Sequence, residues 1–227
     1  MKVSEIFSSI QGEGVNAGNQ AVFLRMALCN LACEWCDTKY TWDWKNYDYV
    51  NEVKEMSLEQ VRTDLLKHGV KHLVLTGGEP MLQQRDLLPL LESLKEAGFF
   101  IEVETNGTLT PTSEMTKVVD QWNVSPKLEN SGNSSSSREK PDCYRFFKQL
   151  RNALFKYVIC THEDLEEVEM LAKRYGIPDG KIMLMPQART REDLAERTRW
   201  LKRESSQRNY LFSTRLQVER WGDRRGV

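Results

Sequence analysis

The amino-acid sequence predicts an α/β fold built on a parallel sheet. Three observations support this: short apolar runs rich in β-branched residues alternate with helical stretches, the helices have readable ends, and 40% of the 227 residues are hydrophobic. Strands separated by helices of this length form parallel pairs with right-handed crossovers. A chain of this size buries roughly 70–75% of its unfolded surface, so we expect one domain over residues 1–227. The periodicity leaves open whether the sheet closes into a barrel.

Five apolar runs are the predicted strands. The first, residues 21–24, leads through Arg25 into a cluster of cysteines. The other four are residues 72–76, 99–103, 155–159 and 181–185. Functional groups of parallel sheets gather at the carboxyl ends of the strands. The chemically distinctive segments of this chain do follow strands. We therefore expect the functional site at the edge of the sheet where the strands end.

Helices are predicted between these runs. Ser57 and Gln60 fit a capping box, and Gly69 follows the end of that helix. A second helix begins at residues 161–164 and stops at Gly176. A third begins at residues 190–193, and residues 87–94 lie in a fourth.

Two stretches do not fit this alternation. Residues 40–49 alternate aromatic and polar side chains, which predicts a small hairpin that covers the cysteine cluster. Residues 129–142 are rich in serine and poor in apolar side chains, so they have too little to pack. We expect a mobile loop there, without a role in catalysis.

Charge and hydropathy exclude several classes of protein. The 32 basic and 33 acidic residues give a formal net charge of −1, without the basic excess of a typical nucleic-acid binder. No apolar run approaches the roughly 18 residues that span a bilayer. The first residues lack the apolar stretch of a signal peptide. We therefore expect a cytoplasmic protein that binds neither nucleic acid nor membrane.

The cysteines are the most informative residues. Three of the five lie within eight residues, at Cys29, Cys33 and Cys36, and the odd total does not suit a disulfide framework. Clustered thiols in a cytosolic chain favour metal or redox chemistry. Cys143 and Cys160 are unrelated in sequence, and free cysteine is commonly a small buried apolar residue.

Several metal or redox sites are compatible with three cysteines. A structural zinc site and an electron-carrier cluster both normally use four protein ligands, and no histidine completes the set. A redox Cys-x-x-Cys pair accounts for Cys33 and Cys36 but leaves Cys29 unused. Three thiolates suit a 4Fe–4S cluster whose fourth iron is open to substrate. A non-enzymatic zinc module remains the main alternative.

The spacing of these cysteines resembles the signature of radical S-adenosylmethionine enzymes. Residues 77–79, Gly-Gly-Glu at the end of a predicted strand, resemble the element that holds the methionine amino group in that superfamily. The resemblance implies a partial or modified (β/α) barrel, a 4Fe–4S cluster and S-adenosylmethionine. The radical derives from that cofactor, so no separate catalytic side chain is expected.

Further motifs resemble the 7-carboxy-7-deazaguanine synthase family. They lie at residues 10–14, 23–25, 35–38, 76–80, 104–107 and 125–127. The resemblance implies a carbon–nitrogen lyase that converts 6-carboxy-5,6,7,8-tetrahydropterin to 7-carboxy-7-deazaguanine and ammonia, in queuosine-type 7-deazapurine biosynthesis. The alternative within the superfamily is an activating enzyme that places a glycyl radical on another protein. Residues 10–14 and Thr38 speak against it.

The same resemblance assigns the site residues. The cluster ligands are Cys29, Cys33 and Cys36, and the ligand of Mg²⁺ is Thr38. The expected substrate contacts are Ile10, Gln11, Gly12, Glu13, Arg25 and Thr76. The expected S-adenosylmethionine contacts are Trp35, Cys36, Asp37, Gly78, Ser125, Pro126 and Lys127. Independently of the family, the Arg25 guanidinium suits a substrate carboxylate because its fork binds both oxygens.

The resemblance also implies partners. An electron donor such as flavodoxin or ferredoxin would reduce the cluster, and a homodimer is expected. Related enzymes place a late histidine or a terminal carboxylate in the pterin pocket. Gln217 occupies the corresponding region here, and the sequence leaves its role open.

Overall fold

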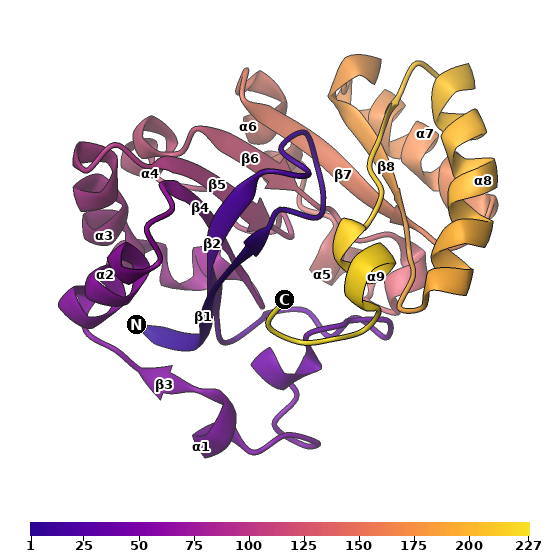
Figure 1. The fold of residues 1–227 in the computed structure, drawn as a ribbon. Helices are drawn as coiled ribbons and strands as arrows, with labels where there is room; N and C mark the ends of the chain where they lie inside the picture. The colour runs from indigo at the N-terminus through magenta and orange to yellow at the C-terminus, as the bar shows by residue number, and fades with distance from the viewer.

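The computed structural model describes residues 1–227 and contains nine strands and nine α-helices (Figure 1). The strands are β1 (Lys2–Ile10), β2 (Gln20–Met26), β3 (Lys54–Glu55), β4 (His72–Gly77), β5 (Phe100–Thr105), β6 (Gln121–Val124), β7 (Ala153–Ile159), β8 (Ile182–Pro186) and β9 (Leu211–Phe212). The α-helices are α1 (Tyr49–Glu52), α2 (Leu58–Lys67), α3 (Gln84–Glu96), α4 (Ser113–Val118), α5 (Ser135–Arg138), α6 (Pro141–Gln149), α7 (Glu163–Tyr175), α8 (Arg191–Gln207) and α9 (Leu216–Trp221). Short 3₁₀ helices are η1 (Lys39–Thr41), η2 (Pro80–Gln83), η3 (Glu129–Ser131) and η4 (Asp179–Lys181).

All strands belong to one sheet with the order β3-β1-β2-β4-β5-β6-β7-β8-β9. Every pair from β2 to β9 is parallel, whereas β1 is antiparallel to both β2 and β3. The two ends of the sheet are not hydrogen-bonded to each other. This arrangement confirms the predicted α/β fold with a partial barrel.

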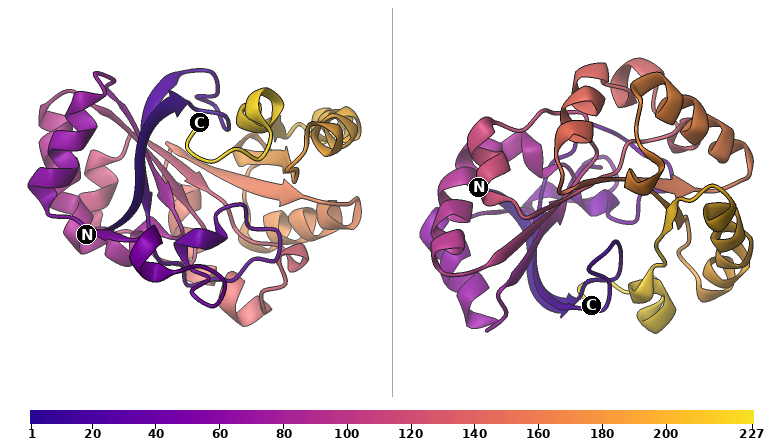
Figure 2. Two further views of the ribbon diagram at one scale, coloured as in Figure 1. Left: turned by 60° about the horizontal axis from the view of Figure 1, so that its bottom comes forward. Right: turned by 90° about the horizontal axis from the view of Figure 1, so that it is seen from above.

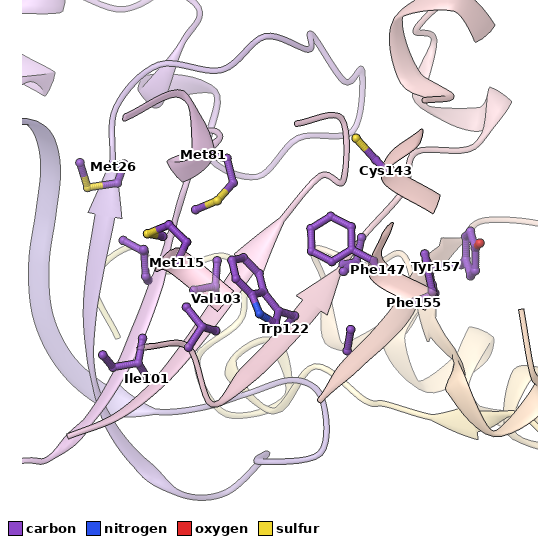
Figure 3. Packing of buried hydrophobic residues seen from close by; sticks show 14 of the residues in the cluster. Met26, Met81, Ile101, Val103, Met115, Trp122, Cys143, Phe147, Phe155 and Tyr157 are labelled. Carbon is purple, nitrogen blue, oxygen red and sulfur yellow. The ribbon is translucent and has the colours of Figure 1, made fainter. Parts of the chain in front are cut away.

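The two faces of the sheet differ in chemistry. The sheet is curved, helices such as α2, α3, α6 and α7 lie on its outer side, and the C-terminal segment with α9 lies on its inner side (Figures 1 and 2). Apolar strand residues such as Val103, Trp122 and Tyr157 pack with helix residues such as Phe147 in the main core (Figure 3). Because side chains alternate along a strand, the neighbours of these residues face inward. The inward positions include charged residues, which the site uses.

The predicted helix ends are confirmed in detail. The Gln60 amide donates to the Ser57 hydroxyl (3.3 Å) and the Ser57 amide donates to the Gln60 side chain (2.8 Å), which completes the capping box of α2. Helix α7 ends at Gly176, whose φ of 62° lies in the left-handed region that glycine tolerates. No helix of the chain has the length and apolar character needed to cross a bilayer.

The predicted hairpin at residues 40–49 is wrong. This stretch forms η1, a series of turns and the start of α1. The Thr41 amide and hydroxyl both donate to the Thr38 carbonyl (2.9 and 2.8 Å), and the Asp48 side chain caps α1. Alternating aromatics did not produce a strand because local hydrogen bonds hold the backbone in turns.

Residues 129–142, for which a mobile loop was predicted, contain η3, α5 and the start of α6. Ser131 is fully buried and Arg138 is 7% exposed. Arg138 Nη1 donates to the Lys127 carbonyl (3.2 Å) and pairs with Glu167 (2.5 Å). Polar contacts thus replace the apolar packing that the segment lacks.

Candidate active site

A cavity of about 290 Å³ opens at the carboxyl ends of the central strands, on the inner side of the sheet. The cysteine loop (residues 29–38) and the C-terminal residues also line it. The predicted site residues that line it are Ile10, Gln11, Gly12, Glu13, Arg25, Cys29, Cys33, Trp35, Cys36, Asp37, Thr38, Thr76, Gly78, Ser125 and Lys127. Pro126 is buried and does not line it. The fold therefore gathers residues from five separate motifs around one space.

Each sulfur of the cysteine loop accepts a hydrogen bond from an N–H group. The donors are the Leu31 amide to Cys29 Sγ (3.5 Å), Asn133 Nδ2 to Cys33 Sγ (3.3 Å) and Trp42 Nε1 to Cys36 Sγ (3.4 Å). N–H donors stabilise negative charge on sulfur, so this environment suits the thiolates of an iron–sulfur cluster. No three His, Cys, Asp or Glu side chains are placed to hold one metal ion, as a zinc site would require. The loop offers three thiols beside an open cavity, the donor set that a 4Fe–4S cluster with one open iron needs.

The thiols of Cys29 and Cys33 are protonated before any metal binds. Burial raises the pKa of Cys29 to about 12 and also raises the pKa of Cys33. Only the thiolate is a metal ligand. Assembly of a cluster must therefore release these protons.

Two glycines let the end of β4 pack against the end of β2 and Leu28, which lead into the cysteine loop. Gly77 has a φ of 136°, and a Cβ atom there would lie 2.2 Å from the Met26 carbonyl oxygen. A Cβ atom on Gly78 would lie 2.1 Å from the Leu28 carbonyl oxygen. Any larger residue would push β4 away from the loop.

Glu79, the third residue of the Gly-Gly-Glu element, is fully buried and does not line the cavity. Its carboxylate accepts from the Met81 amide (3.0 Å), the Thr105 hydroxyl (2.8 Å) and the Asn106 amide (2.6 Å). Burial raises the pKa of Glu79, although these three donors oppose the rise. In this structure the carboxylate joins the ends of β4 and β5.

Arg25 has one edge of its guanidinium free. Glu5 is its cross-strand neighbour, and Arg25 Nε donates to Glu5 Oε2 at 2.8 Å. The guanidinium carbon lies 5.6 Å from the centre of the Phe7 ring. The two Nη atoms make no hydrogen bond within the chain. They remain available to an anion in the cavity.

Glu5 also connects Arg25 to the C-terminal tail. Arg225 Nε donates to the other Glu5 oxygen at 2.5 Å, and Arg225 Nη2 pairs with Glu52 at 2.7 Å. The Arg225 guanidinium stacks over the Tyr40 ring, 3.7 Å from its centre. These contacts hold residues 222–227 against the cavity that they line.

A buried charge network forms the floor of the cavity. Glu13 accepts from Lys156 Nζ (2.7 Å), Arg215 Nε (3.0 Å) and Gln217 Nε2 (2.6 Å). Burial by itself raises the pKa of Glu13, but the charges of Lys156 and Arg215 outweigh it and hold that pKa well below its usual value. Lys156 also bonds Glu104 (2.7 Å), and Arg215 also pairs with Asp37. Glu13 is thus a fixed, ionised acceptor.

The Gln11 side chain is already satisfied within the protein. Its Nε2 donates to Glu102 (2.9 Å) and its Oε1 accepts from the Glu13 amide (3.2 Å). The buried Glu102 also accepts from Asn123 (2.5 Å) and from Asn16 (2.9 Å). Gln11 therefore shapes the turn after β1, and its Oε1, which can accept a second hydrogen bond, still lines the cavity.

The last residues of the chain contact the turn after β1. The Leu216 amide donates to the Gly12 carbonyl (3.0 Å), and the Gly14 amide donates to the Ser213 hydroxyl (2.8 Å). A Cβ atom on Gly12 would lie 1.8 Å from Gln217 Oε1, so a larger residue there would displace the Gln217 side chain. Gln217 Oε1 is buried and has no hydrogen-bond partner in the protein.

Replacing Lys156 with methionine is expected to lower the free energy of unfolding by about 3–5 kcal/mol at pH 7, because a buried carboxylate loses its cation. Without Lys156 the pKa of Glu104, already raised by burial, rises further. The folded state then binds more protons than the unfolded state, so the loss shrinks as the pH falls towards about 5. Urea unfolding at both pH values measures this difference.

The matched control is Lys95→Met, which removes the cation of a partly exposed pair with Asp120 (2.7 Å). This variant should lose less than about 1 kcal/mol, at either pH. Equal losses for Lys156→Met at pH 7 and pH 5 would contradict the buried-charge explanation.

Sequence reasoning missed several residues of this site. Lys156 was inside an apolar run, and the signal that marks it is a single charge in an otherwise buried strand. Glu104 belonged to one of the family motifs but received no role. Tyr40 and Trp42 were assigned to a hairpin rather than to the cavity that they line. Arg215 carried no local signal, because its partners Glu13 and Asp37 are distant in sequence.

Comparison with known proteins agrees with this site. Residues 10–138 match the model of a family described as a 4Fe-4S single cluster domain. The QueE crystal structure from Escherichia coli superposes with a TM-score of 0.70 and 28% identity, covering 94% of this chain and 92% of that one. SuiB of Streptococcus suis, solved with bound S-adenosylmethionine, shares the fold with a TM-score of 0.56 at 14% identity, over 88% of this chain and 53% of its own.

Two relatives in sequence identify the family to which the chain belongs. The 7-carboxy-7-deazaguanine synthase of Pyrobaculum aerophilum is 39% identical over 227 residues, covering 100% of this chain and 97% of the relative. The enzyme of the same name from Rhodopirellula baltica is 31% identical over 239 residues, covering 99% of this chain and 88% of the relative. Both similarities run the length of the fold and include the cysteine loop and the cavity. The chain therefore belongs to the 7-carboxy-7-deazaguanine synthase family of radical S-adenosylmethionine enzymes.

Proposed function

We propose that this chain converts 6-carboxy-5,6,7,8-tetrahydropterin to 7-carboxy-7-deazaguanine with release of ammonia, in queuosine-type 7-deazapurine biosynthesis. The observation that carries the proposal is that the three cysteines and the free edge of Arg25 line the same cavity. Loss of ammonia balances the atoms of substrate and product, so S-adenosylmethionine is regenerated and no further reactant is needed.

Cys29, Cys33 and Cys36 would hold a 4Fe–4S cluster at this cavity. Once bound there, the cluster and S-adenosylmethionine would supply one-electron radical chemistry. The protein's own contribution is to hold the substrate with its reacting carbon towards the cysteine loop. The C-terminal residues 222–227 line the same cavity and would exclude water from it.

The substrate would lie between Arg25 and the turn after β1. The two free Nη atoms of Arg25 match a carboxylate in a paired geometry. The ionised Glu13 carboxylate suits the N–H groups of a pterin edge, and the main-chain groups of Ile10 and Gly12 border the same space. Thr76 adds a hydroxyl, and the Gln11 amide would contact the substrate from the turn that it shapes.

S-adenosylmethionine would lie against the cysteine loop. Trp35, Cys36 and Asp37 line the cavity on the loop, and Gly78, Ser125 and Lys127 line it at the ends of β4 and β6. Lys127 Nζ lies 5.5 Å from the centre of the Trp35 ring and donates to Ser125 Oγ at 3.0 Å. Its charge suits the cofactor's carboxylate. Pro126 lies behind its two neighbours and would shape their turn.

Thr38 would bind Mg²⁺, with substrate oxygens and water completing the shell, since Mg²⁺ keeps few protein ligands. Replacing Thr38 with valine, which keeps the shape, should raise the Mg²⁺ concentration for half-maximal activity at least about tenfold. Thr38→Ser keeps the hydroxyl and should behave like the wild type. Iron content should be normal in both variants. The same Mg²⁺ dependence in Thr38→Val and the wild type would remove Thr38 from the metal site.

The cysteines also bear on the compartment in which the protein works. The cysteines must stay reduced to bind a cluster, which suits the cytoplasm. We propose a flavodoxin or ferredoxin as the electron donor and a homodimer as the assembly, on the resemblance to the family alone.

The function is tested by reconstituting the protein anaerobically with iron and sulfide and adding reductant, S-adenosylmethionine, Mg²⁺ and the carboxytetrahydropterin. We expect one 7-carboxy-7-deazaguanine and one ammonia per substrate consumed, without net loss of S-adenosylmethionine. An intact cluster that cleaves S-adenosylmethionine but forms no deazaguanine would refute the proposal.

A further inference from the structure

The segment 129–138 folds directly onto the cysteine loop. The Glu34 amide donates to the Ser131 carbonyl (3.0 Å), and Trp35 Nε1 donates to Asn130 Oδ1 (3.1 Å). Gly132 has a φ of 75°, and the Glu34 side chain occupies the space where a Cβ atom would project. The segment therefore follows the shape of the loop that carries the predicted cluster ligands.

Asn133 has its amide fixed between two groups of that loop. Its Oδ1 accepts from the Ala32 amide at 3.0 Å, and its Nδ2 donates to Cys33 Sγ at 3.3 Å. Nδ2 also donates to the Ser131 hydroxyl (3.1 Å) and carbonyl (3.4 Å), which hold it beside the sulfur. Arg138 Nε holds the Asn133 carbonyl at 3.2 Å, and Arg138 is itself paired with Glu167. The Arg138–Glu167 pair thus fixes the backbone of Asn133.

Trp42 provides an independent donor from the other side of the loop. Its Nε1 lies 3.4 Å from Cys36 Sγ, and the residue lines the cavity. The two side chains come from segments about 90 residues apart and serve different sulfurs. Neither contact is needed to close the backbone of the loop.

We propose that Asn133 and Trp42 set the reduction potential of the iron–sulfur cluster by donating N–H···S hydrogen bonds to Cys33 and Cys36. The inference rests on the proposed function in one respect, that these cysteines are the cluster ligands. Reduction adds an electron whose charge spreads onto the sulfurs. A donor aimed at a sulfur therefore stabilises the reduced cluster more than the oxidised one and raises the potential. Asn133 and Trp42 are positioning residues, since they act through the cysteines.

Two variants remove these donors. Trp42→Phe removes the indole N–H without changing charge. Asn133→Asp keeps an oxygen for the Ala32 amide and replaces the donor with an acceptor. Both reconstituted variants should show a more negative midpoint potential than the wild type in a redox titration followed by electron paramagnetic resonance. The double variant should show the sum of the two shifts, because the bonds reach different sulfurs.

Matched controls separate the hydrogen bond from other effects. Trp44→Phe removes an indole N–H that makes no hydrogen bond to a sulfur; its ring packs against Tyr49. Asn130→Asp adds the same charge to the same segment, at a residue bonded to Trp35 rather than to a sulfur. Each test variant should have a potential more negative than that of its own control.

The outcomes also separate this inference from the proposed function. Iron and sulfide content and the reduced-cluster signal of the wild type show whether a cluster forms at all. If it forms and the test variants match their controls in potential, the tuning role is overturned while the proposed function stands. A variant unable to hold iron would also count against the proposal, because its side chain would then serve assembly.

Discussion

Cys33→Ala is expected to lose cluster and activity together. Only three cysteines of the chain lie at the cavity, so no other thiol can replace the missing ligand. After anaerobic reconstitution the variant should hold a small fraction of the wild-type iron, and product formation should fall below detection. Iron and sulfide analysis together with the absorbance of the protein measure the first effect, and product chromatography measures the second.

Cys160→Ala is the matched control for this experiment. Cys160 follows β7, does not line the cavity and is not bonded to the cysteine loop. The variant should keep wild-type iron, activity and folding. Normal iron in Cys33→Ala would show that the cluster is held elsewhere, and the site described above would have to be abandoned.

Arg25→Ala is expected to raise the dissociation constant of the carboxytetrahydropterin by roughly 30- to 1000-fold. The estimate corresponds to about 2–4 kcal/mol for a charged, hydrogen-bonded pair removed from a partly buried site. Glu5 keeps its contacts with Arg225 and Tyr40, so β1 should stay in place. Binding of S-adenosylmethionine should be unchanged, because Arg25 lies on β2 and not on the cysteine loop. Calorimetry on the reconstituted, unreduced protein measures both affinities.

Two comparisons show whether the substrate carboxylate is the group that Arg25 recognises. Arg25→Lys keeps the charge but not the fork, so its loss of affinity should lie between those of the wild type and Arg25→Ala. A tetrahydropterin without the carboxylate should bind the wild type and Arg25→Ala equally. If Arg25→Ala raises the dissociation constants of both pterins equally, the residue shapes the pocket and does not bind the carboxylate.

The sequence predicted the parts of the site that are local in the chain. Cys29, Cys33 and Cys36 share one loop, and Arg25 ends the strand before it, so spacing alone shows their relation. Lys156 could not be paired with Glu13, nor Arg215 with Asp37, because only the curvature of the sheet brings them together. Asn133 was missed for a different reason. The composition of its segment shows that apolar residues are lacking. Composition does not show which polar contacts form, such as those of Arg138 and Ser131, so the segment was predicted to be mobile.

For the fold, too, the sequence predicted only the elements that have a clear local pattern. The runs that became β4, β7 and β8 are apolar and were predicted within a residue or two. The strand β6 has only four residues and includes Asn123, whose side chain faces the charged floor, so it lacked a strand pattern. Strand β1 is nine residues long, but its exposed and buried positions do not alternate strictly.

The joining of residues 12–14 to residues 213–217 bears on how the protein is made. The main apolar core draws its last member from Leu201, whereas the contacts of Glu13 with Arg215 and Gln217 span more than 200 positions. Contacts between such distant parts of a chain form late, because closing so long a loop costs entropy before any contact repays it. During folding the core can thus form while the cavity is still unfinished, and the docking of residues 213–217 on the turn after β1 completes it.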